Sequence, residues 1–156
     1  MMTLKILVIC TANICRSPVA QVFLSRLLAG KDVQASSAGT LAVDGNRADP
    51  NMQILMNTHY PEISPQLSNH VSRALMSSHL SSADLVLCME QSHIDWVNKV
   101  QPIAIGKTKL LSHWSNREAI ADPIGGSEQD YQQGFFQMES ECMLWAQKIQ
   151  QLGMCS

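Results

Sequence analysis

The chain begins with a strand, a polar loop and a helix, and this unit constrains the fold more than any other feature. Residues 4–9 form a mostly apolar run rich in β-branched side chains, typical of a strand buried on both faces of a parallel sheet. Ser17-Pro18 then predicts a helix entry, because proline is tolerated in the first helical turn. Apolar residues at helical spacing follow until Gly30 ends the pattern.

The rest of the chain repeats this alternation. Short apolar segments predict further strands at 33–38, 83–89 and 109–112, and other segments predict helices at 51–59 and 91–100. From Tyr131 to Leu152, apolar residues recur in steps of four and three, a stripe that more often packs on a sheet than forms a coiled coil. We therefore expect a single domain over residues 1–156. Its fold would be a three-layer α/β/α arrangement with a central four-stranded parallel sheet, flavodoxin-like or Rossmann-like.

Charge and composition exclude several classes of function. The 11 Lys and Arg residues against 13 Asp and Glu residues give a formal net charge of -2, so there is no electrostatic case for binding nucleic acid. Aromatic residues make up only 5% of the chain, which argues against a platform for stacking single-stranded bases. The run at 4–9 is too short for membrane insertion and lacks the features of a signal peptide, so we expect a cytoplasmic protein.

The cysteines fit neither a disulfide framework nor a zinc site. Their number is odd, and no pair or Cys/His cluster has metal-ligand spacing. Each thiol is therefore expected to be a packing residue or a reactive group. The five are Cys10, Cys15, Cys88, Cys142 and Cys155.

The loop at 10–18 carries the strongest chemical signal. It places Cys10 at the end of the first strand and Arg16 at the start of the helix. At such a junction the loop N–H groups and the helix dipole can surround an oxyanion, and they favour the nucleophilic thiolate form of Cys10. The planar guanidinium of Arg16 can bind two phosphate oxygens at once. The alternative, a packing Cys10 with Arg16 at the surface, is disfavoured by the strand before the loop and the helix after it.

Over nearly its whole length the chain resembles the low-molecular-weight protein tyrosine phosphatases, most closely the bacterial branch that acts on tyrosine kinases of capsule and exopolysaccharide export. The specific motifs are residues 10–18 and Ala121-Asp122-Pro123, with supporting motifs at 36–40, 48–50, 70–73, 83–90 and 113–114. The resemblance implies hydrolysis of phosphotyrosine through a phosphocysteine, without metal or cofactor. Its substrate would be a phosphotyrosine protein such as a bacterial tyrosine autokinase. The oligomeric state is not implied.

The resemblance also assigns roles to individual residues. Cys10 corresponds to the nucleophile, Arg16 to the phosphate clamp and Asp122 to the general acid that protonates the leaving group. Ser17 corresponds to a hydroxyl that donates to the thiolate, although it is also a plausible helix cap. Asn13 corresponds to a loop residue of unusual backbone conformation, and asparagine tolerates positive φ well. The remaining phosphate-binding positions are Thr11, Ala12, Ile14 and Cys15, and the residues expected to brace the loop are Ser37 and His70.

Two interpretations of Cys15 have equal weight. In the family such a neighbour can form a reversible disulfide with the nucleophile and protect it from over-oxidation. A buried packing thiol is the other reading.

The sequence departs from the family pattern at the loop and at the substrate slot. Ala12 replaces a glycine, and its methyl group is tolerated only if φ is negative there. Ile124 replaces an aromatic wall of the slot, and the opposite wall corresponds to Leu41 or Val43. Aliphatic walls forgo aromatic stacking worth about 0.5–1.5 kcal/mol per pair, so a strict preference for phosphotyrosine is not implied.

Two other functions fit parts of the sequence. A thiol-dependent arsenate reductase shares the Cys-x5-Arg loop, and Cys88 is placed where a resolving thiol would be, but no second cysteine follows it in 91–100. Ala12 and Ile124 support a phosphate-binding regulatory module with weak catalysis. The phosphatase interpretation accounts for more of the motifs than either.

Overall fold

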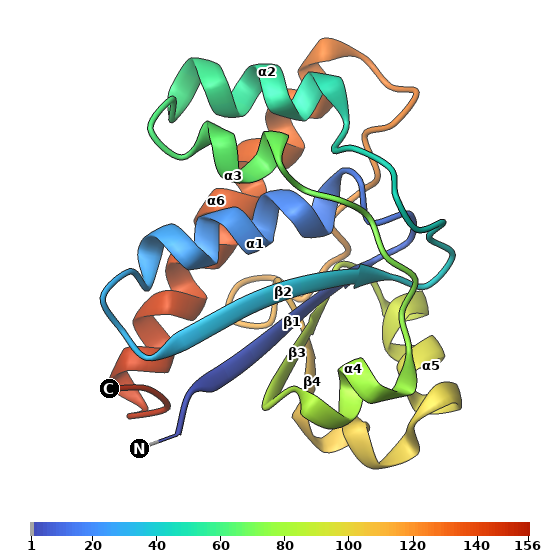
Figure 1. The fold of residues 1–156 in the computed structure, drawn as a ribbon, viewed down its shortest axis with the longest axis vertical. Coiled ribbons are helices and arrows are strands. Elements are labelled where there is room, and N and C mark those ends of the chain that lie inside the picture. The colour runs from blue at the N-terminus through green and yellow to red at the C-terminus, as the bar shows by residue number, and fades with distance from the viewer. Residues whose placement is uncertain (1) are drawn as a thin grey trace.

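A four-stranded parallel sheet in the order β2-β1-β3-β4 forms the centre of the computed structural model, which describes residues 2–156 (Figure 1). The strands are β1 (Leu4–Cys10), β2 (Val33–Gly39), β3 (Leu85–Cys88) and β4 (Thr108–Leu110). The chain runs outward from β1 to β2 and then returns to the other side of β1 to form β3. The strand order therefore reverses between β1 and β3, where ligands of open α/β sheets usually bind.

Helices cover both faces of this sheet, as the sequence predicts. Helix α1 packs on α6 and on β1 and β2, whereas α4 and α5 contact the sheet from its other face (Figure 1). Helices α2 and α3 lie beyond α1 on the first face. The bounds are α1 (Arg16–Leu27), α2 (Pro50–His59), α3 (Ser64–Ser68), α4 (Ser77–Ser82), α5 (Gln91–Val100), η1 (Pro102–Lys107) and α6 (Glu128–Gln151). The three-layer α/β/α fold class is confirmed.

The core consists of two apolar layers, one on each face of the sheet. Alternate residues of β1 supply them: Ile6 and Val8 belong to the layer under α1 and α6, and Leu7 and Ile9 to the layer under α4 and α5. Because both faces are covered, β1 is apolar on both sides, which is why the sequence shows a run rather than an alternation. Within residues 2–156, no helix is both long and apolar enough to cross a bilayer.

The sequence prediction misses the short elements. Helix α4 has the sequence SSHLSS and α3 has five residues, so neither is long enough to show helical periodicity. The predicted fourth strand at 109–112 ends earlier, at Leu110. Leu152, assigned to the apolar stripe, follows the last turn of α6 and is 62% exposed.

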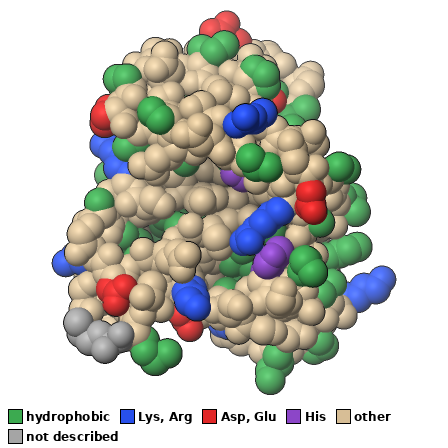
Figure 2. All heavy atoms as spheres, viewed as in Figure 1, with side chains coloured by type: hydrophobic (Ala, Val, Ile, Leu, Met, Phe, Trp, Pro, Cys, Tyr) green, Lys and Arg blue, Asp and Glu red, His purple; other side chains and the backbone are tan. Residues whose placement is uncertain are grey.

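Charged side chains are scattered over the face shown in Figure 2, with both signs interspersed. No block of one sign dominates this face. This distribution agrees with the small net charge of the chain.

Candidate active site

The loop at residues 10–17 connects β1 to α1 and has the properties of an anion-binding nest. Neighbouring segments occupy its carbonyl groups: Thr40 N–H donates to Cys10 O at 2.9 Å, Leu41 N–H to Thr11 O at 2.9 Å, and Asp49 N–H to Ile14 O at 2.7 Å. Within the described residues, the backbone N–H groups of 12–15 donate to no protein acceptor. Buried donors without acceptors are rare in proteins, so this loop is suited to surround an oxyanion.

A glycine at the end of β2 allows the loop to adopt this position. A Cβ atom at Gly39 would lie 2.4 Å from the Thr11 carbonyl oxygen and 3.0 Å from the Asn13 nitrogen. No larger residue fits without moving the loop. Ala12 is not among the described residues with positive φ, so the condition for its methyl group is met.

Cys10 is placed at the base of this loop. Its Sγ lies 2.9 Å from Ser17 Oγ and accepts from Ser17 N–H at 3.4 Å, and the residue is 2% exposed. Ser17 is in the first turn of α1, whose N-cap position is Cys15 and has no side-chain cap. The hydroxyl of Ser17 therefore contacts the sulfur and does not cap the helix.

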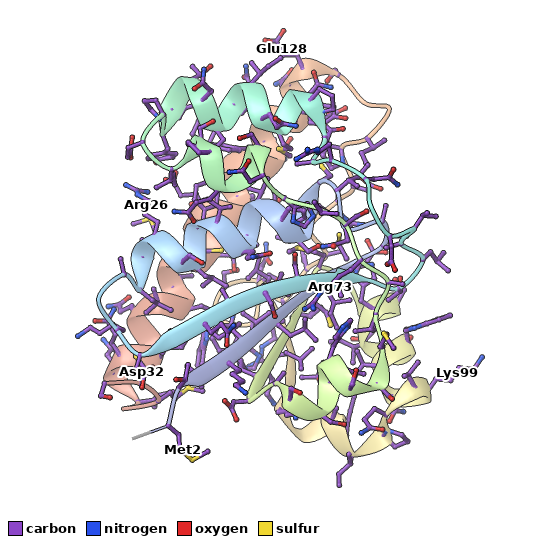
Figure 3. The ribbon with its side chains drawn as sticks, in the orientation of Figure 1. Met2, Arg26, Asp32, Arg73, Lys99 and Glu128 are labelled. Carbon is purple, nitrogen blue, oxygen red and sulfur yellow. The ribbon has the colours of Figure 1, made fainter. Side chains whose placement is uncertain are left out.

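Asn13 connects the loop to its surroundings and has the expected positive φ, 57°. Its side-chain nitrogen donates to Ser17 Oγ at 2.8 Å and to Ser37 Oγ at 2.9 Å. Its side-chain oxygen accepts from Arg73 N–H at 3.0 Å, and its backbone carbonyl is 2.7 Å from His70 Nε2. Figure 3 shows Arg73 beside the sheet in the middle of the molecule. The strained conformation of Asn13 is thus fixed from three sides.

The guanidinium of Arg16 is buried and held on one side by the protein. Nη1 donates to Glu90 Oε2 and to the Ile120 carbonyl, both at 2.9 Å, and Nη2 donates to Thr11 Oγ1 at 3.3 Å. Nε–H has no protein acceptor within residues 2–156. The Nε and Nη2 edge therefore retains two parallel N–H groups, the arrangement that binds phosphate in a bidentate manner.

Asp122 is directed toward this arginine from the loop before α6. Its Oδ2 is 3.9 Å from Arg16 Nη2, and its Oδ1 accepts from Ile124 N–H at 3.1 Å. The side chain is 46% exposed, so the carboxyl group can exchange protons with solvent or with a bound ligand.

The residues predicted to line the substrate slot are all exposed. Ile124 follows Asp122 by two residues, and Leu41 is joined to the loop by its bond to Thr11 O. These contacts place Ile124 next to Asp122 and Leu41 next to the loop at 10–17. Val43 is also exposed, and its backbone carbonyl accepts from the Ser72 hydroxyl.

Cysteines outside the loop are packing residues. Cys88 and Cys142 are fully buried, and burial raises the pKa of both thiols. Cys155 packs against the larger core layer at partial exposure. Cys15 is buried in the same loop as Cys10, and burial together with Asp49 and Asp122 raises its pKa.

Two residues at the site, Glu90 and His93, were missed as functional candidates. Glu90 forms an ion pair with Arg16 at 2.9 Å; although partial burial raises its pKa, hydrogen bonds from Arg16 and Ser92 lower it overall. His93 lies 3.0 Å from Thr11 Oγ1. Both follow the carboxyl end of β3, next to β1. The sequence signal that could have identified them is their position, because both are polar residues that closely follow β3, one of the two central strands.

The comparisons with known proteins agree with this geometry. Residues 5–153 match the family described as low molecular weight phosphotyrosine protein phosphatase. The chain belongs to this family. It is accordingly a protein-tyrosine phosphatase of the low-molecular-weight type, a hydrolase with a cysteine in its phosphate-binding loop.

Solved structures extend the match to the whole fold. The chain is 35% identical to the Erwinia amylovora tyrosine phosphatase AmsI, with 94% of this chain and 93% of that chain covered and a TM-score of 0.86. It is 34% identical to the tyrosine phosphatase Wzb from Escherichia coli K30 in complex with phosphate, covering 95% and 99% of the two chains with a TM-score of 0.82. A third similar structure is the YwlE arginine phosphatase from Geobacillus stearothermophilus, with 30% identity, coverage of 97% and 96%, and a TM-score of 0.85. AmsI and Wzb represent the capsule and exopolysaccharide branch expected from the sequence.

Proposed function

We propose that this phosphatase hydrolyses phosphotyrosine through a covalent phosphocysteine on Cys10. The observation that carries this proposal is the position of Cys10 Sγ at the base of a loop whose N–H groups at 12–15 have no protein acceptor among residues 2–156. The thiolate attacks phosphorus, an S–P bond forms and the bond to the tyrosine oxygen breaks. The free loop N–H groups and the Nε/Nη2 edge of Arg16 bind the remaining phosphate oxygens and stabilise their charge in the transition state.

Asp122 supplies the proton that the leaving group needs. A phenoxide is a poor leaving group near neutral pH, so protonated Asp122 donates to the tyrosine oxygen as its bond to phosphorus breaks. The resulting carboxylate then accepts a proton from a water molecule that attacks phosphocysteine. This second step breaks the S–P bond, releases inorganic phosphate and restores the thiolate. The exposure of Asp122 and its approach to Arg16 support both roles.

Ser17 stabilises the thiolate in both steps, as the nucleophile before attack and as the leaving group afterwards. Asn13, Ser37 and His70 hold the loop through the contacts described above. Leu41 and Ile124 form the aliphatic sides of the entrance. The substrate class that follows is a phosphotyrosine in a protein segment. For a cytoplasmic enzyme of the Wzb and AmsI branch, this segment would belong to a tyrosine autokinase.

A panel of peptides tests the substrate class. The same peptide sequence is prepared with phosphotyrosine, phosphoserine, phosphothreonine and phosphoarginine, and phosphate release is measured for the wild type and for Cys10→Ser. We expect release from the phosphotyrosine peptide alone, and none with Cys10→Ser. Preferential release from phosphoarginine would overturn the proposed substrate class. The similarity to the YwlE arginine phosphatase makes the phosphoarginine peptide the most informative comparison.

The covalent intermediate has its own test. Rapid acid quenching during turnover, followed by mass spectrometry of the tryptic peptide around Cys10, should reveal one added phosphoryl group. Asp122→Asn should change its amount, because Asp122 acts in both formation and hydrolysis. Phosphate binding without turnover on any of the peptides would instead indicate a phosphate-binding module. Thiol oxidation that depends on arsenate would indicate a reductase.

A further inference from the structure

The first turn of α5 places a buried histidine against the phosphate loop. His93 is 2% exposed, and both of its ring nitrogens have partners. Nδ1 is 3.3 Å from the backbone nitrogen of Glu90, and Nε2 is 3.0 Å from Thr11 Oγ1. The mechanism above gives this side chain no role.

The contact with Glu90 decides which ring nitrogen carries the proton. A backbone N–H can only donate, so Nδ1 is the acceptor. In a neutral imidazole the hydrogen is then on Nε2, which donates to the hydroxyl oxygen of Thr11. Burial, with a smaller effect from the charge of Arg16, lowers the pKa of His93 to about 4, so the ring is neutral near physiological pH.

The same hydroxyl oxygen accepts a second hydrogen bond from Arg16 Nη2, at 3.3 Å. With donors from His93 and Arg16, both acceptor positions of the Thr11 oxygen are filled. Glu90 meanwhile accepts from Nη1 of the same guanidinium at 2.9 Å. Glu90, the N-cap residue of α5, and His93, in its first turn, therefore hold opposite ends of the guanidinium, Glu90 directly and His93 through Thr11.

We propose that His93 is a positioning residue of the phosphate site: through the Thr11 hydroxyl it orients Arg16 so that the Nε/Nη2 edge faces the bound phosphate. This inference rests on the proposed role of Arg16 as the phosphate clamp. It assigns a role in phosphate binding to the side chain of Thr11. Glu90 and the Ile120 carbonyl hold the guanidinium at Nη1 only, and the bond from Nη2 to Thr11 adds a contact at the edge that faces the phosphate.

Two substitutions test the roles of the two ring nitrogens of His93 separately. In His93→Gln the amide nitrogen occupies roughly the position of Nε2 and can donate to Thr11. In His93→Asn the shorter amide occupies roughly the position of Nδ1, so it can accept from Glu90 N–H but cannot reach Thr11. Thr11→Val removes the hydroxyl with little change in shape, and Thr11→Ser keeps it.

The measurement is the dissociation constant for inorganic phosphate, by calorimetry, together with the inhibition constant for vanadate. A net hydrogen bond is worth about 0.5–1.5 kcal/mol, so His93→Asn and Thr11→Val should each weaken phosphate binding by roughly twofold to tenfold. His93→Gln and Thr11→Ser should stay within about twofold of the wild type. Because Thr11→Val already removes the hydroxyl through which His93 acts, the pair Thr11→Val/His93→Asn should bind phosphate no more weakly than Thr11→Val alone.

His79 provides a matched control. It occupies the same third position of α4, and its Nδ1 is 3.1 Å from the backbone nitrogen of Met76, but within the described residues it forms no hydrogen bond to the loop at 10–17. His79→Asn and His79→Gln should leave phosphate binding unchanged. Equal phosphate affinities for His93→Asn and His93→Gln would overturn the proposal, as would independent, additive losses for Thr11→Val and His93→Asn.

Measuring phosphate affinity tests the positioning role of His93 separately from the proposed hydrolysis of phosphotyrosine. If the wild type binds phosphate but hydrolyses no phosphopeptide, the proposed function fails, while the phosphate affinities still test His93. If His93→Asn does not fold, the pair Thr11→Val and Thr11→Ser decides the question through the same hydroxyl. Equal phosphate affinities for that pair would also overturn the proposal.

Discussion

Asn13 donates its side-chain N–H to Ser17 Oγ at 2.8 Å, and this contact fixes the direction of the neighbouring hydrogen bond to Cys10. The orientation of the amide is itself fixed, because its oxygen accepts from the backbone N–H of Arg73. With an acceptor position of the Ser17 oxygen occupied, its hydrogen is free to point to the sulfur 2.9 Å away. Ser17 is therefore a donor to Cys10, which is the polarity that stabilises a thiolate.

Asn13→Asp tests this polarity. Aspartate has nearly the same shape and also tolerates positive φ, but its carboxylate cannot donate to Ser17 and would instead attract the Ser17 hydrogen. A hydrogen bond to a charged group is worth about 1.5–3 kcal/mol, so kcat with p-nitrophenyl phosphate should fall by roughly tenfold to a hundredfold. A value of kcat within twofold of the wild type would show that the amide does not set the direction of the bond. Ser17→Ala should give a similar loss.

Asp122→Asn should reduce kcat/KM, which reports formation of the phosphocysteine and not its hydrolysis, in proportion to how much the leaving group needs a proton. For phenyl phosphate and phosphotyrosine we expect a loss of about 10²–10⁴-fold, the usual contribution of a general acid. For 2,4-dinitrophenyl phosphate, whose phenoxide leaves without a proton, the loss should be much smaller. An equal loss with both substrates would contradict the assignment of Asp122 as general acid. Glu128→Gln, on the exposed first turn of α6, is a suitable control.

The stability of the protein should decrease as the pH falls below about 6.5. The pKa of His93 is 6.5 before folding and about 4 in the folded protein, because of burial and then of the charge of Arg16, with Glu90 and Asp122 opposing. Between these values only the unfolded chain binds the proton, so acidification favours unfolding. This side chain alone accounts for up to about 3 kcal/mol, present above pH 6.5 and lost toward pH 4.

Urea unfolding at a series of pH values measures this effect. The wild type should lose more stability than His93→Gln between about pH 6.5 and pH 4, since glutamine does not titrate. Parallel stability curves for the two proteins would contradict a neutral, buried imidazole at position 93.

Cys15 should protect Cys10 from irreversible oxidation, and the protection should be faster at high pH. After peroxide treatment, Cys10 sulfenic acid would react with Cys15, releasing water and forming a disulfide that an added thiol reduces. Because burial and the nearby carboxylates raise the pKa of Cys15, its thiolate is scarce near neutral pH, and disulfide formation should accelerate as pH increases. Mass spectrometry and recovery of activity follow both steps. If Cys15→Ser recovers as fully as the wild type, Cys15 is a packing thiol only.

Ile124→Tyr should improve binding of aryl phosphates. Ile124 is 43% exposed beside Asp122, so an aromatic ring there can be accommodated without repacking the core. An added aromatic contact is worth about 0.5–1.5 kcal/mol, which predicts a KM for phenyl phosphate lower by roughly twofold to tenfold. The same substitution should not change the affinity for inorganic phosphate, which lacks a ring. An unchanged KM for phenyl phosphate would mean that Ile124 does not contact the substrate.

The sequence by itself determines the parts of this protein that are continuous along the chain. The apolar run before Cys10, the spacing to Arg16 and the helix after it identify a phosphate loop, because all of its N–H groups come from adjacent residues. The long pattern of α6 and the buried strands β1 and β3 are likewise read from local periodicity.

The tertiary structure decides which distant side chains complete the loop and in which direction their hydrogen bonds run. Glu90 and His93 reach Arg16 and Thr11 across 74 and 82 residues of sequence because the sheet order places the carboxyl ends of β1 and β3 side by side. Ser37 contacts Asn13 across 24 residues because β1 pairs with β2. Arg73 contacts Asn13 across 60 residues because the segment that follows α3 returns to the loop. Chain order contains no distance information of this kind, and a polar residue after a strand becomes part of the site only when strand pairing brings it there.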